Sequence, residues 1–500
     1  MAELPGTPRS LWLSAGEPEP RPAFEGEREA DVAVVGGGIV GAATALLLAE
    51  RGVSVALLEA RRIAGAVTGN STAKVTALHQ TPYSEITRKV GPDAAGAYAQ
   101  ANLDGVAMVA SLVDRHTIDC ALEIGPAFLY TEDEATTLEV EAEAEAARAA
   151  GLDVELTDQT DLPFPVVAAA RLDDQIGLDS AALTRGLADA AEAAGAVLHE
   201  HSRVRSIDHG DPCRLELENG AVLRAERAVL ATQMPLLDRG LFFARLRPQA
   251  SYAVAAPAEH APLGMYLGIG GATRSVRSTP GPGGSRRLIV GGEGHKVGQG
   301  DGAAAYQRLA AWLGERFEAG SVEHRWSAHD LMSPDKLPMI GELAPFAGRI
   351  LTATGFSKWG LAIGVAAAAM LTGELVGEPD ARREAFDTRR LNLRAALPEL
   401  VKENADVGMR FFAGRLKRDS GGPLAPGEGR VAGDGPRQIA ECRDFDGNLH
   451  RLSARCPHLG CIVTWNGGDA TWDCPCHGSR FEADGSVRNG PATAPLEPAG

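Results

Sequence analysis

The segment DVAVVGGGIVGAATALLLAERGVSVALLEA, residues 31–60, constrains the fold of this chain more than any other. A short apolar strand leads into a glycine-rich turn, an Ala- and Leu-rich helix runs to Gly52, and a second apolar strand follows. This order is a βαβ unit of about 30 residues, which places two parallel strands side by side with a helix on the sheet. The sequence therefore predicts an α/β architecture for the N-terminal part.

The turn inside this unit has the spacing Gly36-x-Gly38-x-x-Gly41. Gly36 permits a sharp turn, Gly38 lets a pyrophosphate approach the backbone, and Gly41 lets the helix pack closely on the strand. The N-terminus of the helix offers free N–H groups and a positive dipole end to the phosphates. Glu59, at the end of the second strand, can accept hydrogen bonds from ribose hydroxyls. We therefore predict a dinucleotide site, and the motif by itself leaves FAD and NAD open.

A second motif lies near the C-terminus, where four of the seven cysteines and two of the twelve histidines cluster. It consists of Cys456-x-His458-x-x-Cys461 and, further on, Cys474-Pro-Cys476-His477. Two cysteines and two histidines can hold zinc tetrahedrally. Zinc would leave the two remaining cysteines without a role, whereas each segment offers one thiolate and one imidazole. That division suits a two-iron cluster with both thiolates on one iron and both imidazoles on the other.

Length and composition predict a multidomain protein. Five hundred residues correspond to about two to four domains. Composition divides the chain into an irregular arm (1–25), a main body (26–380), a helix with a Gly/Pro-rich linker (381–429) and a Cys/His-containing domain (430–500). The net charge of −17 argues against a nucleic-acid partner. The scattered Cys120, Cys213 and Cys442 are expected to be reduced core residues.

Two features bear on the cellular location. The first 27 residues lack a basic start followed by an apolar run. The apolar stretch 359–377 meets Glu374 too early to supply the roughly 18 to 20 apolar residues that a membrane span requires. We therefore expect a cytoplasmic protein without a membrane span.

Residues 31–379 resemble the D-amino-acid-oxidase-like superfamily of FAD-dependent oxidoreductases, which includes glycine and sarcosine oxidases. The resemblance is carried by the βαβ unit and by the segments GNSTAKVTALH, RAVLATQMP and DKLPMIGEL…RILTATGFSKWGLAIG. It implies FAD as the cofactor and a Rossmann-like FAD-binding domain with an inserted α+β substrate domain. The FAD-binding parts would be about 26–80, 176–235 and 326–380, and the substrate domain about 81–175 and 236–325.

The same resemblance implies roles for individual residues. Val204 would contact the adenine, and the turn from Gly355 to Gly360 would face the flavin ring. Lys358, in this turn, would supply positive charge beside the flavin. His295 would lie on a strand set against the substrate face of the flavin, where it could orient the substrate or take a proton.

Residues 430–500 resemble the Rieske [2Fe–2S] domain of the type found in cytochrome bc complexes, a small all-β fold. The resemblance implies the iron ligands Cys456 and Cys474 on one iron and His458 and His477 on the other. It also implies a disulfide between Cys461 and Cys476 that ties the two ligand loops together.

The two cofactors together predict electron transfer. A flavin takes two electrons at once and a Rieske cluster passes one at a time, and the chain has no second glycine fingerprint for NAD(P)H. We therefore expect a small amine or amino acid to reduce FAD, which passes electrons through the cluster to an external acceptor. Two alternatives stay open: an electron-transfer protein loaded by an outside reductase, or an oxidase whose Rieske domain is a redox sensor or a structural module.

Overall fold

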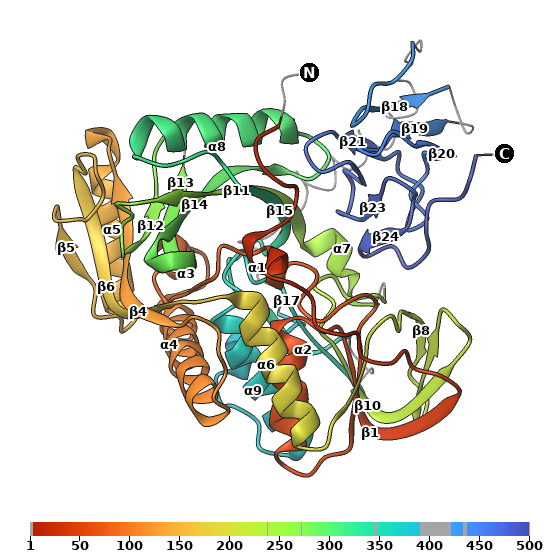
Figure 1. Ribbon diagram of the computed structural model, residues 1–500. Helices are drawn as coiled ribbons and strands as arrows, with labels where there is room; N and C mark the ends of the chain where they lie inside the picture. The colour runs from red at the N-terminus through yellow and green to blue at the C-terminus, as the bar shows by residue number, and fades with distance from the viewer. Residues whose placement is uncertain are drawn as a thin grey trace.

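The computed structural model describes residues 4–237, 239–271, 273–344, 348–390, 422–433 and 438–499. Two sheets with their helices form the main body, and a separate all-β domain ends the chain (Figure 1). Most of the predicted helix and linker over 381–429 lies outside the described residues, which resume at 422. No helix in the described ranges is long and apolar enough to cross a membrane.

The first sheet contains the predicted βαβ unit. Its path is β16-β17-β10-β1-β2-β7, with β9 pairing with β10 and β8 with β9. The strands are β1 (Glu27–Val35), β2 (Val55–Leu58), β7 (Val197–His199), β8 (Val204–Asp208), β9 (Cys213–Leu217), β10 (Val222–Leu230), β16 (Met339–Glu342) and β17 (Ile350–Thr354). The central strand β1 runs parallel to both β2 and β10, as a Rossmann-like βαβ unit requires.

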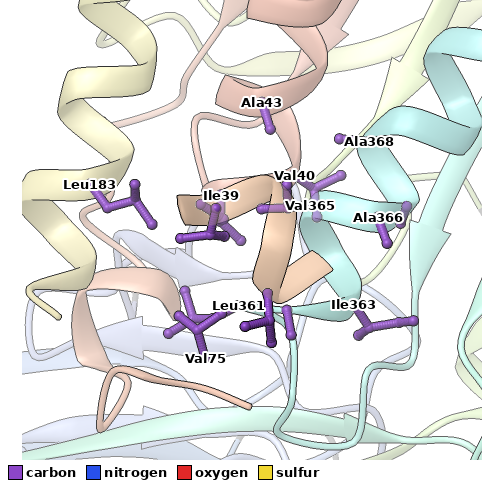
Figure 2. Packing of buried hydrophobic residues seen from close by; sticks show 14 of the residues in the cluster. Ile39, Val40, Ala43, Val75, Leu183, Leu361, Ile363, Val365, Ala366 and Ala368 are labelled. Atoms are coloured by element: carbon purple, nitrogen blue, oxygen red, sulfur yellow. The ribbon is translucent and has the colours of Figure 1, made fainter. Parts of the chain in front are cut away.

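Three helices pack together beside this sheet: α2 (Ile39–Ala49), α6 (Ser180–Ala193) and α9 (Ile363–Val376). All eleven residues of α2 are buried, which explains why its sequence is apolar on every side. Figure 2 shows Val40 of α2 beside Val365 of α9, with Leu183 of α6 on the other side of Ile39. This packing fixes the N-terminus of α2, where the glycine turn ends.

The second sheet has the path β15-β11-β14-β13-β12-β4-β6-β3, with β5 pairing with β6. Its strands are β3 (Lys74–Val75), β4 (Glu123–Thr131), β5 (Glu155–Thr157), β6 (Ala168–Gly177), β11 (Arg247–Ala258), β12 (Met265–Gly268), β13 (Arg274–Pro280), β14 (Arg286–Lys296) and β15 (His324–Met332). The remaining helices of the body are α3 (Pro82–Lys89), α4 (Pro92–Arg115), α5 (Thr137–Ala149), α7 (Phe242–Arg245), α8 (Gly302–Arg316) and α10 (Arg383–Phe386). Because β15 pairs with β11, residues 324–332 belong to this sheet, although the FAD-binding part is predicted from the sequence to resume at about 326.

The N-terminal arm, over the described residues 4–25, is irregular apart from one turn of helix. It contains the short helix α1 (Leu11–Ser14), capped by the hydroxyl of Ser10, which accepts a hydrogen bond from the backbone N–H of Leu13 at 3.3 Å. Trp12 is only 3% exposed. The arm is therefore packed on the body.

The C-terminal domain is all-β, as predicted. One sheet joins β18 (Gly429–Ala432), β19 (Ile439–Arg443) and β20 (Leu449–Ser453). The other joins β21 (Thr464–Asn466), β22 (Thr471–Asp473), β23 (Arg480–Glu482) and β24 (Val487–Asn489). In Figure 1 this domain, drawn in blue, lies beside α7 and β15 of the main body.

Candidate cofactor sites

The glycine turn between β1 and α2 has the geometry that a bound pyrophosphate requires. Gly36 has a φ of 109°, and a Cβ built on it would lie 2.6 Å from the carbonyl oxygen of Ala231. A Cβ on Gly41 would lie 1.8 Å from the carbonyl oxygen of Gly36. Gly38 begins α2 without a side-chain cap and lines a cavity. The first turn of α2 is thus open to a phosphate.

Glu59 lies beside this turn at the end of β2. Its carboxylate accepts hydrogen bonds from the backbone N–H of Gly37 at 2.7 Å and of Arg61 at 2.8 Å. Burial raises the pKa of Glu59, while these two hydrogen bonds oppose the shift. The backbone of Ser202 donates to the carbonyl of Glu59 at 2.8 Å, which brings the segment leading to Val204 next to it. Glu59 and the buried Val204 are thus on the side where the adenosine is expected.

A cavity of about 470 Å³ continues from the turn into the space between the two sheets. One wall is the segment 68–74, which we call the flavin loop, and another is the turn 355–361. Gly355, Lys358 and Gly360 all line this cavity, and so does Gly38 of the glycine turn. The predicted flavin residues are therefore brought together with the phosphate turn, and the residues present fit FAD.

Lys358 and His295 differ in their relation to this cavity. Lys358 lines it opposite Asp330; burial lowers the pKa of Lys358, and the carboxylate of Asp330 partly offsets that shift. His295 is outside the lining: its ring lies 5.3 Å from that of Tyr252, and its Nδ1 is 3.0 Å from the carbonyl of Lys296. His295 therefore has no role in the function proposed below.

Besides Lys358, four cationic residues that were not predicted from the sequence line the cavity: Lys74, Arg247, Arg274 and Lys336. Lys74 donates hydrogen bonds to the hydroxyls of Thr72 at 2.7 Å and Ser275 at 2.6 Å. Desolvation lowers the pKa of Lys74 well below its usual range. Arg274 is paired with Glu293 at 2.7 Å. One feature of the sequence could have indicated Lys74: it stands between two apolar residues, Ala73 and Val75, and a charged residue is seldom buried in a strand.

The Cys/His motif forms a compact cage on two loops. The thiol of Cys474 is hydrogen-bonded to that of Cys456, and this bond lowers the pKa of Cys456. The rings of His458 and His477 are 5.0 Å apart between centroids. Cys456 and Cys474 are both reduced and buried. Two thiols and two imidazoles thus converge from two loops, which fits the two-iron arrangement.

A disulfide joins the two loops between Cys461 and Cys476, as expected. The sulfur atoms of Cys461, Cys474 and Cys476 lie within 4.8 Å of one another, a spacing that by itself could hold a metal. Two of these sulfurs are used in the disulfide, so Cys474 is the one thiol of this group left for a metal. The disulfide therefore holds the cage together, and the second thiolate comes from Cys456.

Comparison with known families settles the class of protein. Residues 31–374 match the family described as FAD dependent oxidoreductase, and residues 424–499 match the Rieske [2Fe-2S] domain. The chain belongs to the FAD-dependent oxidoreductases and carries a C-terminal Rieske domain. FAD and a [2Fe–2S] cluster are accordingly its cofactors, and Cys120, Cys213 and Cys442 remain free, buried thiols.

Relatives agree with this architecture. The Rieske 2Fe-2S iron-sulfur protein YhfW of Bacillus subtilis (strain 168) is 32% identical over 495 residues, which cover 98% of this chain and 97% of the relative. The cytochrome b6-f complex iron-sulfur subunit 1 of a Synechocystis species is 52% identical over 54 residues, 10% of this chain and 30% of that subunit. The first of these relatives has the same two-part arrangement along almost its whole length.

Solved structures share the fold of the oxidoreductase body. Glycine oxidase from Geobacillus kaustophilus superposes with a TM-score of 0.60 at 21% identity and covers 73% of this chain and 99% of its own. L-Amino acid deaminase from Proteus myxofaciens gives 0.58 at 18% identity, with 76% and 95% covered. These likenesses concern the fold of the body.

The Rieske domain is docked on the oxidoreductase with its cluster loop against β11. A Cβ on Gly478, next to His477, would lie 2.5 Å from the Cβ of Pro248. The neighbours of Pro248 in the strand, Arg247 and Gln249, line the flavin cavity. One strand of the oxidoreductase therefore separates the ligand loop from this cavity.

Both ligand imidazoles face the oxidoreductase at helix α7. The ring of Phe243 lies 5.1 Å from that of His477 and 5.7 Å from that of His458, in edge-to-face geometry. His477 is 5% exposed, whereas His458 is partly exposed. The cluster thus has a covered side toward the flavin domain and an accessible side at His458.

A buried polar network fixes the docked position. Asp469 accepts hydrogen bonds from Tyr306 of α8 at 2.6 Å and from Ser327 of β15 at 2.7 Å, and it pairs with Arg480. Arg480 also donates to Ser327 at 2.8 Å and pairs with Asp473 at 3.0 Å. Asp473 directly precedes the ligand Cys474. This interface network, defined as these five residues, connects both domains to the cluster.

We expect two irons and two labile sulfides per chain, with an electron-resonance signal typical of mixed Cys/His ligation. His458→Ala should remove or alter this signal while FAD stays bound, because the FAD site is in the other domain. His450→Ala is the control, since His450 pairs with Asp444 at 2.9 Å away from the cage. Zinc in place of iron in anaerobically purified, iron-replete protein would contradict the ligand assignment.

Proposed function

We propose that the chain oxidises a small amine or amino acid at its C–N bond and passes the electrons from FAD through the Rieske cluster to an acceptor outside the chain. The contact of Gly478 with Pro248 carries this proposal, because it sets the ligand loop one strand from the flavin cavity. A redox-sensing or merely structural Rieske domain would not require this closeness.

Bound FAD accepts two electrons from a substrate and the cluster takes them one at a time. The chain's own residues would bind and orient the substrate in the cavity. Its charged lining is mostly cationic: Lys74, Arg247, Arg274, Lys336 and Lys358, with Asp330 as the acidic member. This lining favours a substrate that carries a carboxylate and favours the neutral amine over the ammonium form.

Lys358 is the residue to which we assign the most direct role. Its ammonium would stabilise negative charge that develops on the reduced flavin, and Asp330 would keep this lysine charged despite its burial. The partly exposed His458 marks the side from which an external acceptor could approach the cluster. The covered His477 would be on the side where electrons enter.

An anaerobic titration tests the proposal. Small amines and amino acids, with glycine and sarcosine first, are added while flavin and cluster absorbance are followed. We expect bleaching of the flavin and then of the cluster. Bleaching only by an added reductase or dithionite would support an electron-transfer protein instead. Flavin turnover with oxygen while the cluster stays oxidised would support a redox sensor or structural module.

Lys358→Met should slow flavin reduction by at least about tenfold, a loss of roughly 1.4 kcal/mol of transition-state stabilisation. FAD content and the cluster signal should not change, because Lys358 belongs neither to the glycine turn that would bind the pyrophosphate nor to the Cys/His motif. Stopped-flow measurement of flavin reduction checks this result. Lys296→Met, on β14 but outside the cavity lining, is the control. A rate for Lys358→Met within about twofold of wild type would remove this lysine from the mechanism.

A further inference from the structure

The side of the flavin loop that faces away from the cavity is bound by the N-terminal arm. The indole N–H of Trp12 donates to the carbonyl oxygen of Ser71 at 2.8 Å, and the hydroxyl of Ser10 donates to that of Gly69. Leu13 packs so closely that a Cβ on Gly69 would lie 2.8 Å from its Cδ2 atom. Two residues of the arm therefore hold two carbonyls of a loop whose other side lines the cavity, and a third packs against it.

Arg277 binds the next two carbonyls of the same loop. Its guanidinium donates to Thr72 at 3.3 Å and also to Ala73, and it lies over the ring of Trp12 at 5.5 Å. Arg277 is 1% exposed, and within the described ranges no carboxylate forms an ion pair with it. Burial lowers its pKa to about 10.

Burying an arginine that forms no ion pair with a carboxylate is costly, so other contacts must stabilise the guanidinium of Arg277. Here its Nε and Nη1 donate to backbone carbonyls, while its Nη2 has no hydrogen-bond partner among the described residues. Its guanidinium also lies over an aromatic ring in a favourable cation–π arrangement. Ser10, Trp12 and Arg277 thus bind four of the carbonyls from Gly69 to Ala73, and the backbone N–H of Leu178 also donates to that of Ala73 at 3.3 Å. Trp12 and Arg277 together donate to three of these carbonyls and so stabilise this conformation of the loop.

We propose that Trp12 and Arg277 are positioning residues for FAD: they hold the flavin loop in its binding conformation before the cofactor arrives. A loop that is ordered in advance loses less conformational entropy on binding, so the cofactor binds more tightly. The arm lies before residue 31, where the match to the oxidoreductase family begins. This part of the FAD site is thus built by a segment outside the matched region, and it is independent of which substrate is oxidised.

The test compares FAD binding in four full-length proteins after removal and re-addition of FAD. Trp12→Ala should raise the dissociation constant of FAD at least about tenfold. Trp12→Phe keeps a ring against Arg277 but lacks the N–H donor, and we expect an intermediate value. Arg9→Gln is the control, because Arg9 pairs with Glu17 at the surface of the same arm.

Hydrogen exchange and the visible circular dichroism of the bound flavin separate positioning from general loss of stability. In Trp12→Ala, exchange should rise in residues 68–74 and the flavin spectrum should change, while the cluster signal stays as in wild type. A dissociation constant within about twofold of wild type would overturn the proposal. So would weaker binding with unchanged exchange in the loop. If Trp12→Ala fails to fold, Trp12→Phe decides, and wild-type affinity in that variant would also overturn it.

Discussion

Gly38→Val should purify with an intact Rieske cluster and less than about one tenth of the wild-type FAD, which corresponds to at least about 1.4 kcal/mol of lost binding free energy. Gly38 begins α2, has a φ of −80° that valine can adopt, and its nearest neighbour for an added Cβ is the hydroxyl of Thr68 at 3.2 Å. The folded protein can therefore accommodate most of the change. The branched side chain would instead occupy the place where the pyrophosphate meets the backbone.

Two other glycines show why Gly38 is the informative position. Valine at Gly41 would collide with the carbonyl of Gly36, so that variant should lose the fold of the βαβ unit as well as FAD. Gly314, at an exposed position of α8, has no atom within 4 Å of an added Cβ, and Gly314→Val should keep both cofactors. Flavin absorbance and iron content per chain measure the outcome. Full FAD content in Gly38→Val would show that the pyrophosphate binds elsewhere.

Local patterns were sufficient to predict most elements of the fold. The βαβ unit depends on contacts within about 30 residues, and its period of apolar residues and its glycines are visible in the sequence. The Asn219–Gly220 turn likewise marks the hairpin between β9 and β10. The helix α1 in the arm was not predicted, because its four residues are too few for a periodic pattern. The pairing of β15 with β11 joins strands about 70 residues apart, and no local signal specifies such a partner.

The candidate sites divide in the same way. The predicted iron ligands lie on two short loops with characteristic spacing, within the segment that the Rieske family matches. The flavin cavity is also lined by Lys74 and Asp330, which come from β3 and β15 at the two ends of one sheet's path and are far apart in the sequence. The family resemblance placed the strand of His295 against the flavin, but successive residues of a strand point to opposite faces. Gly294 lines the cavity and His295 does not.

The docking of the two domains could not be predicted from the sequence. The Rieske segment has a nearly balanced charge, so no charged surface marks its partner. The contact is made by a few buried groups from α8, β15 and the strands beside the cluster. Its position matters for function, because the flavin cavity and the ligand loop meet across a single strand, at Pro248. Anything that loosens the interface network should slow electron transfer without removing either cofactor.

Arg480→Met should therefore undock the Rieske domain while FAD and the cluster remain bound. Arg480 is 2% exposed and pairs with both Asp469 and Asp473. Removing it leaves two buried carboxylates without their ion-pair partner, which typically costs about 3 to 5 kcal/mol. Hydrogen exchange at the interface should rise at least about tenfold. After flavin photoreduction with light and EDTA, reduction of the cluster should slow at least about tenfold. Arg451→Met, which removes the ion pair between the exposed Arg451 and Glu441 of β19, is the control.

The response to acid should differ in steepness between the two proteins. In the wild type, burial raises the pKa of Asp469, but the charges of Arg480 and Arg488 and the hydrogen bonds from Tyr306 and Ser327 together lower it more, so it lies well below its usual range. A depressed carboxyl pKa contributes stability that is complete above the unfolded value near 4 and is lost as the pH falls below it. In Arg480→Met the hydrogen bonds from Tyr306 and Ser327 and the charge of Arg488 still lower the pKa of Asp469, but the largest of the lowering contributions is gone. The pKa should therefore lie closer to its unfolded value, and docking should weaken less steeply than in the wild type as the pH falls from 7 toward about 3. Interface exchange measured across this range checks the difference. Docking of Arg480→Met that weakens with acid as steeply as in the wild type, or an unchanged rate of cluster reduction at pH 7, would show that this ion pair does not hold the domains together.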